Sequence, residues 1–78
     1  MAIAFVLINT EIDAMEKVLD SLKSVAEITE AYSLYGTYDI IAKVKSENSD
    51  KLNNIISGKI RRLNNVRNTI TLIAVEKM

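Results

Sequence analysis

The chain has 78 residues, of which 49% are hydrophobic, and its ten basic and ten acidic side chains leave a formal net charge of zero. A chain of this length forms one domain, and its own core seldom supplies more than about 3–5 kcal/mol of net stability. The absence of cysteine and histidine excludes disulfide bonds and argues against a zinc site, so oligomerisation is the expected source of further stability. The balanced charge gives no global field that would attract nucleic acid or anionic lipid.

The N-terminal segment 2–8, AIAFVLI, is wholly apolar. It is too short to cross a bilayer and has no basic region before it, so we expect a cytoplasmic protein with no membrane partner. Its length and its β-branched and aromatic residues predict a strand that is covered on both faces. The many Ile, Lys and Glu residues, with the lack of Gln, Trp, Cys and His, hint at a thermophilic source.

A helix is predicted to follow this strand. The Thr10 hydroxyl is placed to cap it by accepting a backbone N–H, and the acidic residues Glu11 and Asp13 favour the positive end of the helix. The opposite side of the helix carries charged residues and is expected to face solvent. Its apolar stripe, at helical spacing, consists of Ile12, Met15, Leu19 and Leu22.

Two strands joined by a tight turn are predicted in the middle of the chain. Near-alternation of apolar and polar residues over 24–35 predicts the first strand, and residues 38–45 form the second. Between them, Gly36-Thr37 suits a two-residue type II′ turn in which the glycine supplies a positive φ. A hairpin is therefore expected, with its tip at these two residues.

The predicted register of this hairpin sorts its residues onto two faces. Leu34 lies opposite Asp39, and Glu30 lies opposite Lys43 as a favourable cross-strand charge pair. One face is small and apolar, so helices can pack closely on it. That face consists of Ala31, Ser33, Ile40, Ala42 and Val44.

The last third of the chain predicts one more helix and one more strand. Asn48 or Ser49 opens the helix, and the pair Asn64-Asn65 ends it, because asparagine tolerates the left-handed conformation. Threonines and β-branched residues throughout 66–76 predict the final strand. The apolar stripe of the helix consists of Leu52, Ile55, Ile56, Ile60 and Leu63.

The resulting order of elements is βαββαβ. With right-handed crossovers it gives an α+β fold of the ferredoxin-like type, a four-stranded antiparallel sheet with both helices on one face. The other face then keeps Tyr32, Leu34 and Ile41 and one side of the apolar first strand. Leaving such side chains in water forfeits roughly 1.5–3 kcal/mol each, so we expect a homodimer in which two sheets face each other, a dimeric α+β barrel-type assembly.

Two stretches carry a resemblance to a known family. EAYSLYGTYDIIAKV at 30–44, followed by a capped helix and then LNNVRNTITLIAV at 63–75, closely resembles the ligand-binding half of the Lrp/AsnC regulators, called the RAM domain. The most specific parts are GTYD at 36–39 and VRNTIT at 66–71. The resemblance covers nearly the whole chain, so residues 1–78 are interpreted as a single RAM domain.

The resemblance implies a small effector, usually an amino acid, that binds between dimers, and dimers that assemble into rings such as octamers. It also implies that the effector lies beside the hairpin turn and the last strand. A carboxylate beside exposed turn N–H groups suits a zwitterion, because the carboxylate can bind an ammonium while backbone donors or threonine hydroxyls bind a carboxylate. The effector-binding residues implied in this way are Gly36, Thr37, Tyr38, Asp39, Thr69, Thr71 and Leu72.

Two departures from the family pattern stand out. The family's helix-turn-helix normally precedes this domain, whereas here only Met1 precedes the first strand; we therefore expect a stand-alone module without direct DNA binding. Such a module would act on transcription through its effector or by joining full-length Lrp/AsnC relatives. The family's usual glycine before Val66 is Asn65, a mild change because asparagine tolerates the same backbone.

Other interpretations stay open. Asp39 can be a turn residue only, and Thr69 and Thr71 can be ordinary strand residues. An ACT-like amino-acid sensor of metabolic enzymes shares the fold, and so does a small dimeric α+β barrel enzyme. We expect no catalysis and no cofactor, because the chain has no histidine, cysteine or serine–base constellation. An RNA-recognition module needs aromatic residues on its third strand, where this chain has isoleucines.

Overall fold

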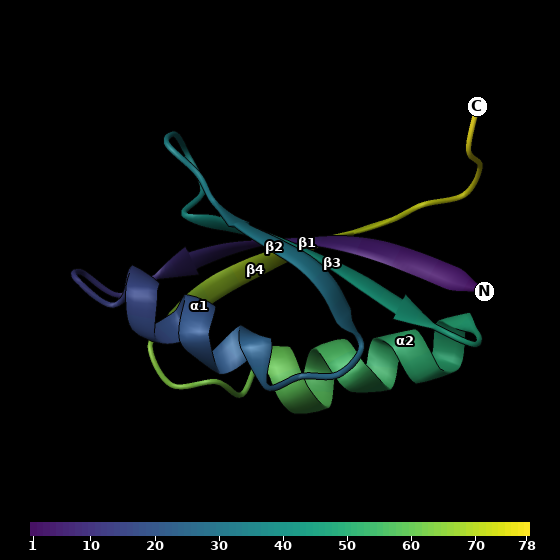
Figure 1. Ribbon diagram of the computed structural model, residues 1–78, viewed down its shortest axis with the longest axis horizontal. Coiled ribbons are helices and arrows are strands. Elements are labelled where there is room, and N and C mark those ends of the chain that lie inside the picture. Colours follow the sequence, from purple (N-terminus) through teal and green to yellow (C-terminus); the bar gives the residue numbers. More distant parts are fainter.

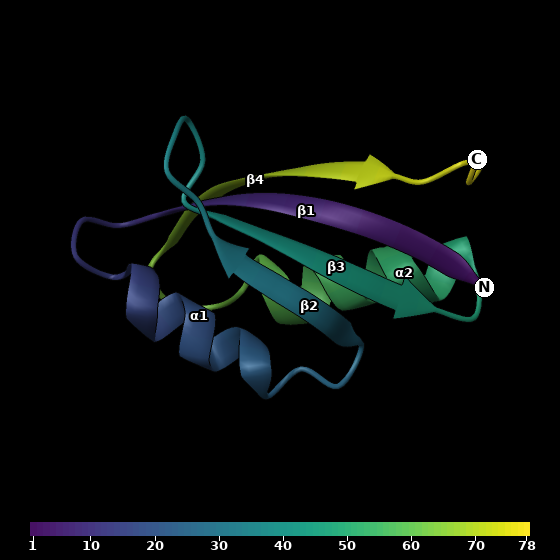
Figure 2. The same cartoon turned by 45° about the horizontal axis from the view of Figure 1, so that its top comes forward.

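The computed structural model describes residues 1–78, and its elements follow the predicted order. The four strands form one antiparallel sheet in the order β2-β3-β1-β4, and both helices lie on the same side of it (Figures 1 and 2). This confirms the ferredoxin-like α+β fold, and no helix is long and apolar enough to span a bilayer. The elements are β1 (Ala2–Thr10), α1 (Met15–Lys23), β2 (Ile28–Ser33), β3 (Ile40–Ser46), α2 (Ser49–Ile55), the π-helical segment η1 (Ile56–Ile60) and β4 (Val66–Ile73).

The helices close one face of the sheet, which we call the closed face. In the register of the ladder, Val6 lies opposite Ala42, and Ile8 lies opposite Ile40. These small and β-branched side chains are fully buried against the helices. The second helix buries most of its predicted stripe, because residues three and four apart share one side of a helix, whereas α1 buries Leu22 of its predicted stripe together with Val18, which the prediction left out. The buried helical residues are Val18, Leu22, Leu52, Ile55, Ile56 and Ile60.

The other side of the sheet, which we call the open face, is apolar and carries no helix. Along β1, buried residues alternate with half-buried ones, so within one chain the helices cover one face of this strand and leave its other face open. Tyr32, Ile70 and Leu72 are 56%, 44% and 51% exposed on this side. Figure 1 shows the loop between β2 and β3 and the C-terminal residues rising on the same side. The register assigns to the open face Ile3, Phe5, Leu7, Tyr32, Ile41, Ile70 and Leu72, with the charged Glu30 and Lys43.

The start of the first helix differs from the prediction. Thr10 is the last residue of β1 and caps no helix; α1 begins at Met15, after Ala14, with no side-chain cap. Asp13 adopts a left-handed φ of 63°, which interrupts any helix there. Ile12 is 87% exposed and does not join the apolar stripe. The prediction failed because the N–H and the hydroxyl of Thr10 both donate to the Asp39 carboxylate.

The hairpin keeps its predicted register but not its predicted turn. Glu30 lies opposite Lys43, and the Leu34 N–H donates to the Asp39 carbonyl at 2.8 Å. However, residues 34–39 form a six-residue loop, and Gly36 does not adopt a positive φ. The type II′ turn is therefore wrong, because the strands end at Ser33 and Ile40 and the longer loop needs no left-handed glycine.

The second helix begins as predicted and ends differently. The Asn48 side chain accepts a hydrogen bond from the Lys51 N–H at 2.9 Å, which is an N-terminal cap. The last turn widens into η1, where the Arg61 N–H donates to the Ile56 carbonyl at 2.9 Å, five residues back. The helical segment ends at Ile60 and not at Asn64-Asn65 as predicted; Asn65 does take a left-handed φ of 71°, but in the turn directly before β4. The final strand stops at Ile73 and not at 76 as predicted.

Candidate functional site

Asp39 joins the end of β3 to the end of β1. Its N–H donates to the Ile8 carbonyl at 3.0 Å, and its Oδ2 accepts from the Thr10 N–H at 2.8 Å and from the Thr10 hydroxyl at 3.2 Å. Thr10 is 7% exposed, so these contacts form at a mostly dry place. The Asp39 carboxylate therefore takes the place of a backbone carbonyl as the acceptor for the Thr10 N–H. Because the same carboxylate also accepts from the Thr10 hydroxyl, that hydroxyl caps no helix.

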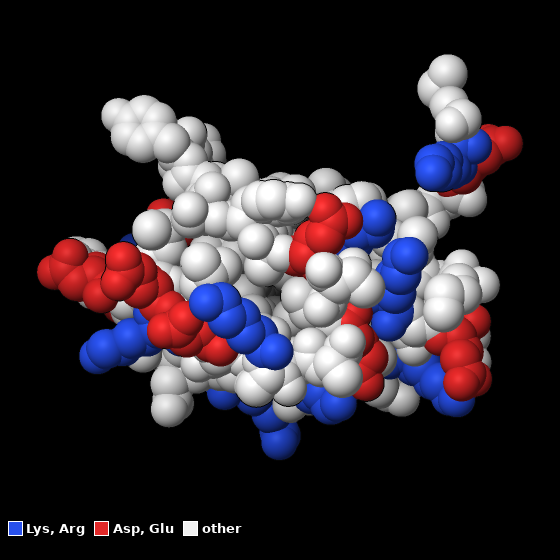
Figure 3. All heavy atoms as spheres, viewed as in Figure 1, with Lys and Arg blue, Asp and Glu red and all other residues white.

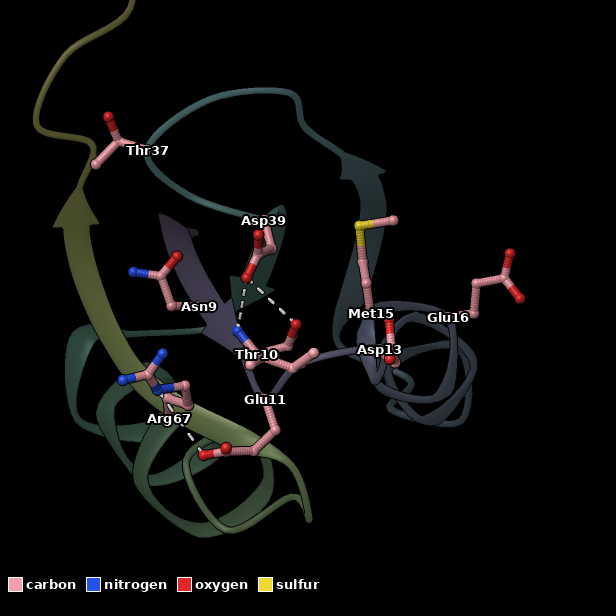
Figure 4. Close-up of a pocket in the computed structure, with 10 residues that line it drawn as sticks. Asn9, Thr10, Glu11, Asp13, Met15, Glu16, Thr37, Asp39 and Arg67 are labelled. Carbon is pink, nitrogen blue, oxygen red and sulfur yellow. Dashed lines mark hydrogen bonds and ion pairs between the residues drawn. The ribbon is translucent and has the colours of Figure 1, made fainter.

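A depression of about 730 Å³ opens beside this carboxylate (Figure 4). Four carboxylates line it and only one basic side chain does, so its charge favours a ligand with an ammonium group. Figure 3 shows acidic side chains gathered at this end of the molecule, where the loop between β1 and α1 lies. No group of acidic, histidine or cysteine residues is placed to hold a metal ion. The lining consists of Asn9, Thr10, Glu11, Ile12, Asp13, Met15, Glu16, Thr37, Asp39 and Arg67.

The edge of the depression formed by β1 and β4 contains a β-bulge. Asn9 pairs with Asn68, and Thr10 pairs with Val66, so Arg67 has no partner on β1. The Asn9 amide donates to the Asn68 side chain at 3.1 Å. A bulge turns a side chain out of the regular alternation of a strand, and here the residue concerned lines the depression.

Two of the seven residues predicted to bind an effector line the depression: Asp39 and Thr37. Gly36 and Tyr38 lie in the same loop, but they are not part of the lining. Figure 4 shows Thr37 on the loop above Asp39. Of the four predicted residues in loop 34–39, the structure therefore places Thr37 and Asp39 at the depression.

The three predicted residues of β4 lie along the strand, outside the lining. Thr69 and Thr71 belong to the closed face, and Leu72 belongs to the open face. The Thr69 hydroxyl accepts from Arg61 Nε at 3.3 Å. The Thr71 hydroxyl oxygen is buried without a hydrogen-bond partner.

Sequence reasoning missed the contribution of the loop after β1 and of the bulge. Asn9, Glu11 and Arg67 all line the depression. The bulge is visible in the structure as a break in period: Val66 packs against the core although it lies three residues from Thr69, a spacing that a regular strand cannot place on one face. No local pattern in the sequence indicates this extra residue.

A second polar cluster lies on the open face. The Tyr32 hydroxyl donates to Glu30 Oε1 at 2.6 Å, and Lys43 Nζ lies 3.4 Å from Glu30 Oε2. These contacts hold the pKa of Glu30 below its ordinary value, the tyrosine hydrogen bond first, and the same hydrogen bond raises the pKa of Tyr32. These three residues thus form a charged cluster on a face that is otherwise largely apolar.

A family model of the Lrp/AsnC ligand binding domain matches residues 3–78. The chain belongs to the Lrp/AsnC family. The transcriptional regulator FL11 of Pyrococcus furiosus is 31% identical over 74 residues, which are 95% of this chain and 48% of FL11. The chain thus spans about half the length of the curated Lrp/AsnC relatives that it matches.

Solved structures of Lrp/AsnC-type proteins agree with this assignment. The crystal structure of FFRP-DM1 has a TM-score of 0.92 and 36% identity, and the match covers 96% of this chain and 100% of that one. The regulator NMB0573 of Neisseria meningitidis, solved as a complex with L-Met, has a TM-score of 0.89 over 99% of this chain and 51% of that chain. Its identity is 14%, so this likeness concerns the fold alone.

Proposed function

We propose that this chain is an effector-binding and oligomerisation module that senses an amino acid and modulates transcription through assembly. The depression beside Asp39 is the proposed effector site. Thr37 lines its upper side, and Gly36 and Tyr38 of the same loop are assigned to the effector as well. Thr69, Thr71 and Leu72 extend the proposed site along β4 when a neighbouring dimer completes it. That a regulator of the same fold was solved with L-Met supports an amino acid as the ligand class.

The observation that carries this proposal is the arrangement of the Asp39 carboxylate. Both hydrogen bonds from Thr10 go to Oδ2, so this one oxygen holds the end of β1 in place. A carboxylate has two acceptor oxygens, and Oδ1 is assigned to the ammonium group of the ligand. The same side chain therefore both fixes the rim of the depression and supplies its charge.

The open face is proposed to bind a second copy of this chain. Its apolar residues lie on all four strands, the Glu30 cluster lies among them on β2 and β3, and the Asn9–Asn68 pair lies at one end; a largely apolar surface with a few polar groups suits a protein interface. Further association of dimers into rings would then bring a second loop 34–39 to each effector site. We also propose that full-length Lrp/AsnC regulators share this face, which would let the chain enter their assemblies.

A thermal-unfolding panel with each standard amino acid tests the effector site. A ligand that binds only the native state raises the unfolding temperature by an amount that grows with the logarithm of its concentration relative to its dissociation constant. We expect one or a few amino acids to raise it in the unaltered chain and to raise it much less in Asp39→Asn. The proposal fails if no amino acid raises the unfolding temperature, or if the rise is equal in the variant.

The proposed mixed assembly has its own test. The chain would be co-expressed with a full-length Lrp/AsnC regulator encoded by the same genome, and the complexes would be examined by native mass spectrometry. We expect masses that contain both chains, and their loss with Ile41→Glu, which places a charge on the shared open face. Separate homo-oligomers only would contradict this part of the proposal.

A further inference from the structure

The bulge in β4 gives Arg67 an unusual position. Arg67 is the extra residue between Val66, which pairs with Thr10, and Asn68, which pairs with Asn9. Its backbone therefore has no partner on β1. A bulge placed next to a depression commonly turns a functional side chain towards it. Figure 4 shows the guanidinium of Arg67 beside Asn9, at the edge of the depression.

The contact that Arg67 makes is weak. Its Nε lies 3.8 Å from Glu11 Oε1, and the two side chains are 57% and 58% exposed. An exposed pair at this distance contributes little, and it is far from the bidentate geometry that a guanidinium adopts with a well-placed carboxylate. Glu11 also belongs to the lining of the depression. A carboxylate from the protein thus occupies, loosely, the place where a carboxylate from a ligand would bind.

We infer that Arg67 binds the carboxylate group of the ligand and that Glu11 competes with that group for Arg67. This inference rests on the proposed amino-acid site and assigns the second half of it. Asp39 binds the ammonium group at one side of Thr10, and Arg67 binds the carboxylate at the other. Ligand binding then separates Glu11 from Arg67 and frees the loop between β1 and α1 from this contact.

Thr10 connects the segments that carry the two charged side chains. Thr10 donates its N–H to Asp39 and pairs with Val66, the residue directly before Arg67. The negative and the positive side chain therefore flank the same residue of β1. A ligand that bridges them carries both an ammonium and a carboxylate group, as an amino acid does.

Other donors are less suited to the carboxylate. Arg67 is the one basic side chain in the lining. The nearby Arg61 donates to the Thr69 hydroxyl at 3.3 Å, which engages both groups with each other. A threonine hydroxyl is also a single neutral donor, whereas a guanidinium offers two parallel N–H groups and a charge.

The experiment compares amino acids with their α-amides, which keep the ammonium group and lack the carboxylate. Binding to the unaltered chain, Arg67→Gln and Glu11→Gln is measured by calorimetry, with all standard amino acids as probes. Arg62→Gln is the matched control, because Arg62 is an exposed arginine outside the depression. Thermal unfolding of each variant checks that it is folded.

We expect Arg67→Gln to weaken binding of the amino acid about tenfold to a hundredfold, the range for loss of one charge-assisted contact. Glu11→Gln removes the competitor and should strengthen binding roughly two- to fivefold, as loss of an exposed ion pair predicts. Arg62→Gln should bind like the unaltered chain. The amides should bind to the unaltered chain about as weakly as the acids bind to Arg67→Gln.

The outcomes separate this inference from the proposed function. If an amino acid binds the unaltered chain, and Arg67→Gln and Glu11→Gln bind it equally well, Arg67 is not its anchor and the proposed site survives. Equal binding of acids and amides overturns the inference in the same way. Binding that is detected only in Glu11→Gln supports it. If no amino acid binds either the unaltered chain or Glu11→Gln, the proposed function itself fails, and the inference fails with it.

Discussion

Ile40 and Ile41 are adjacent in β3, yet they meet different surroundings. Ile40 is fully buried on the closed face, opposite Ile8, whereas Ile41 is half-buried on the open face, opposite Leu7 and Tyr32. The helices that cover the first residue have no counterpart over the second (Figure 1). One residue type in one strand thus has two roles: Ile40 on the closed face helps to hold the chain folded, and Ile41 on the open face, in the proposed dimer, helps to hold two chains together.

Ile40→Glu should have the largest effect. Truncation of a buried isoleucine already costs about 2–5 kcal/mol, and an unpaired buried charge costs more. A chain of this size has about 3–5 kcal/mol in its core, so we expect the variant to be unfolded. Circular dichroism measures this directly, and a native spectrum with an unchanged unfolding temperature would contradict the assignment of the closed face.

Ile41→Glu is the matched substitution on the open face. The side chain can reach solvent in a single chain, so the fold should persist, but a charge without a partner in an interface between two sheets should dissociate the dimer. Light scattering at micromolar concentration is the measurement. Dimers that survive in the variant, or an unaltered chain that is already monomeric, would show that the open face does not bind a second copy.

Asp39→Asn tests the rim where loop 34–39 meets β1. The asparagine oxygen can still accept from the Thr10 N–H, so we expect a modest change in unfolding temperature. Loss of the charge should weaken binding of the amino acid by roughly 1.5–3 kcal/mol, or about ten- to a hundredfold. Calorimetry and thermal unfolding together decide: a large drop in unfolding temperature with unchanged affinity would make Asp39 a structural residue only.

The smallest effect concerns the Glu30 cluster on the open face. Because Tyr32 and Lys43 hold the pKa of Glu30 below its ordinary value, the charged form is favoured in the folded chain. Its stabilising contribution is therefore complete above the ordinary glutamate pKa and is lost as the pH falls through the lowered value. We expect Glu30→Gln to flatten the acid limb of the stability profile in that window. An unchanged limb in urea titrations across the acid range would contradict this.

Much of the fold was predictable from local patterns. Asn48 marks the start of the second helix, and the turn centred on Gly36-Thr37 gave the correct hairpin register, with Glu30 opposite Lys43. These signals act between residues that are close in sequence or directly opposite in one hairpin, so a single chain displays them. The closed face was also predictable, because period two in a strand and helical spacing in a helix identify the buried sides.

The errors have a common physical origin in contacts between distant segments. Thr10 was assigned to a helix because its hydroxyl can cap one, but Asp39 lies 29 residues away and takes that hydroxyl instead. The turn at Gly36 was predicted to have two residues, whereas the loop has six, because its length depends on where both strands end. The bulge at Arg67 depends on pairing with β1, and no local rule specifies such a pairing. The candidate site is built from these three places, so only Thr37 and Asp39 of its lining were predicted.

Sedimentation velocity of the unaltered chain, with and without the amino acid selected by the thermal panel, tests the central claim that effector binding and assembly are coupled. Asp39→Asn is the matched sample. We expect dimers or larger species in the unaltered chain and a shift in their distribution when the amino acid is added, with no such shift in the variant at the same concentration. A distribution that stays the same while the amino acid is bound would contradict the account.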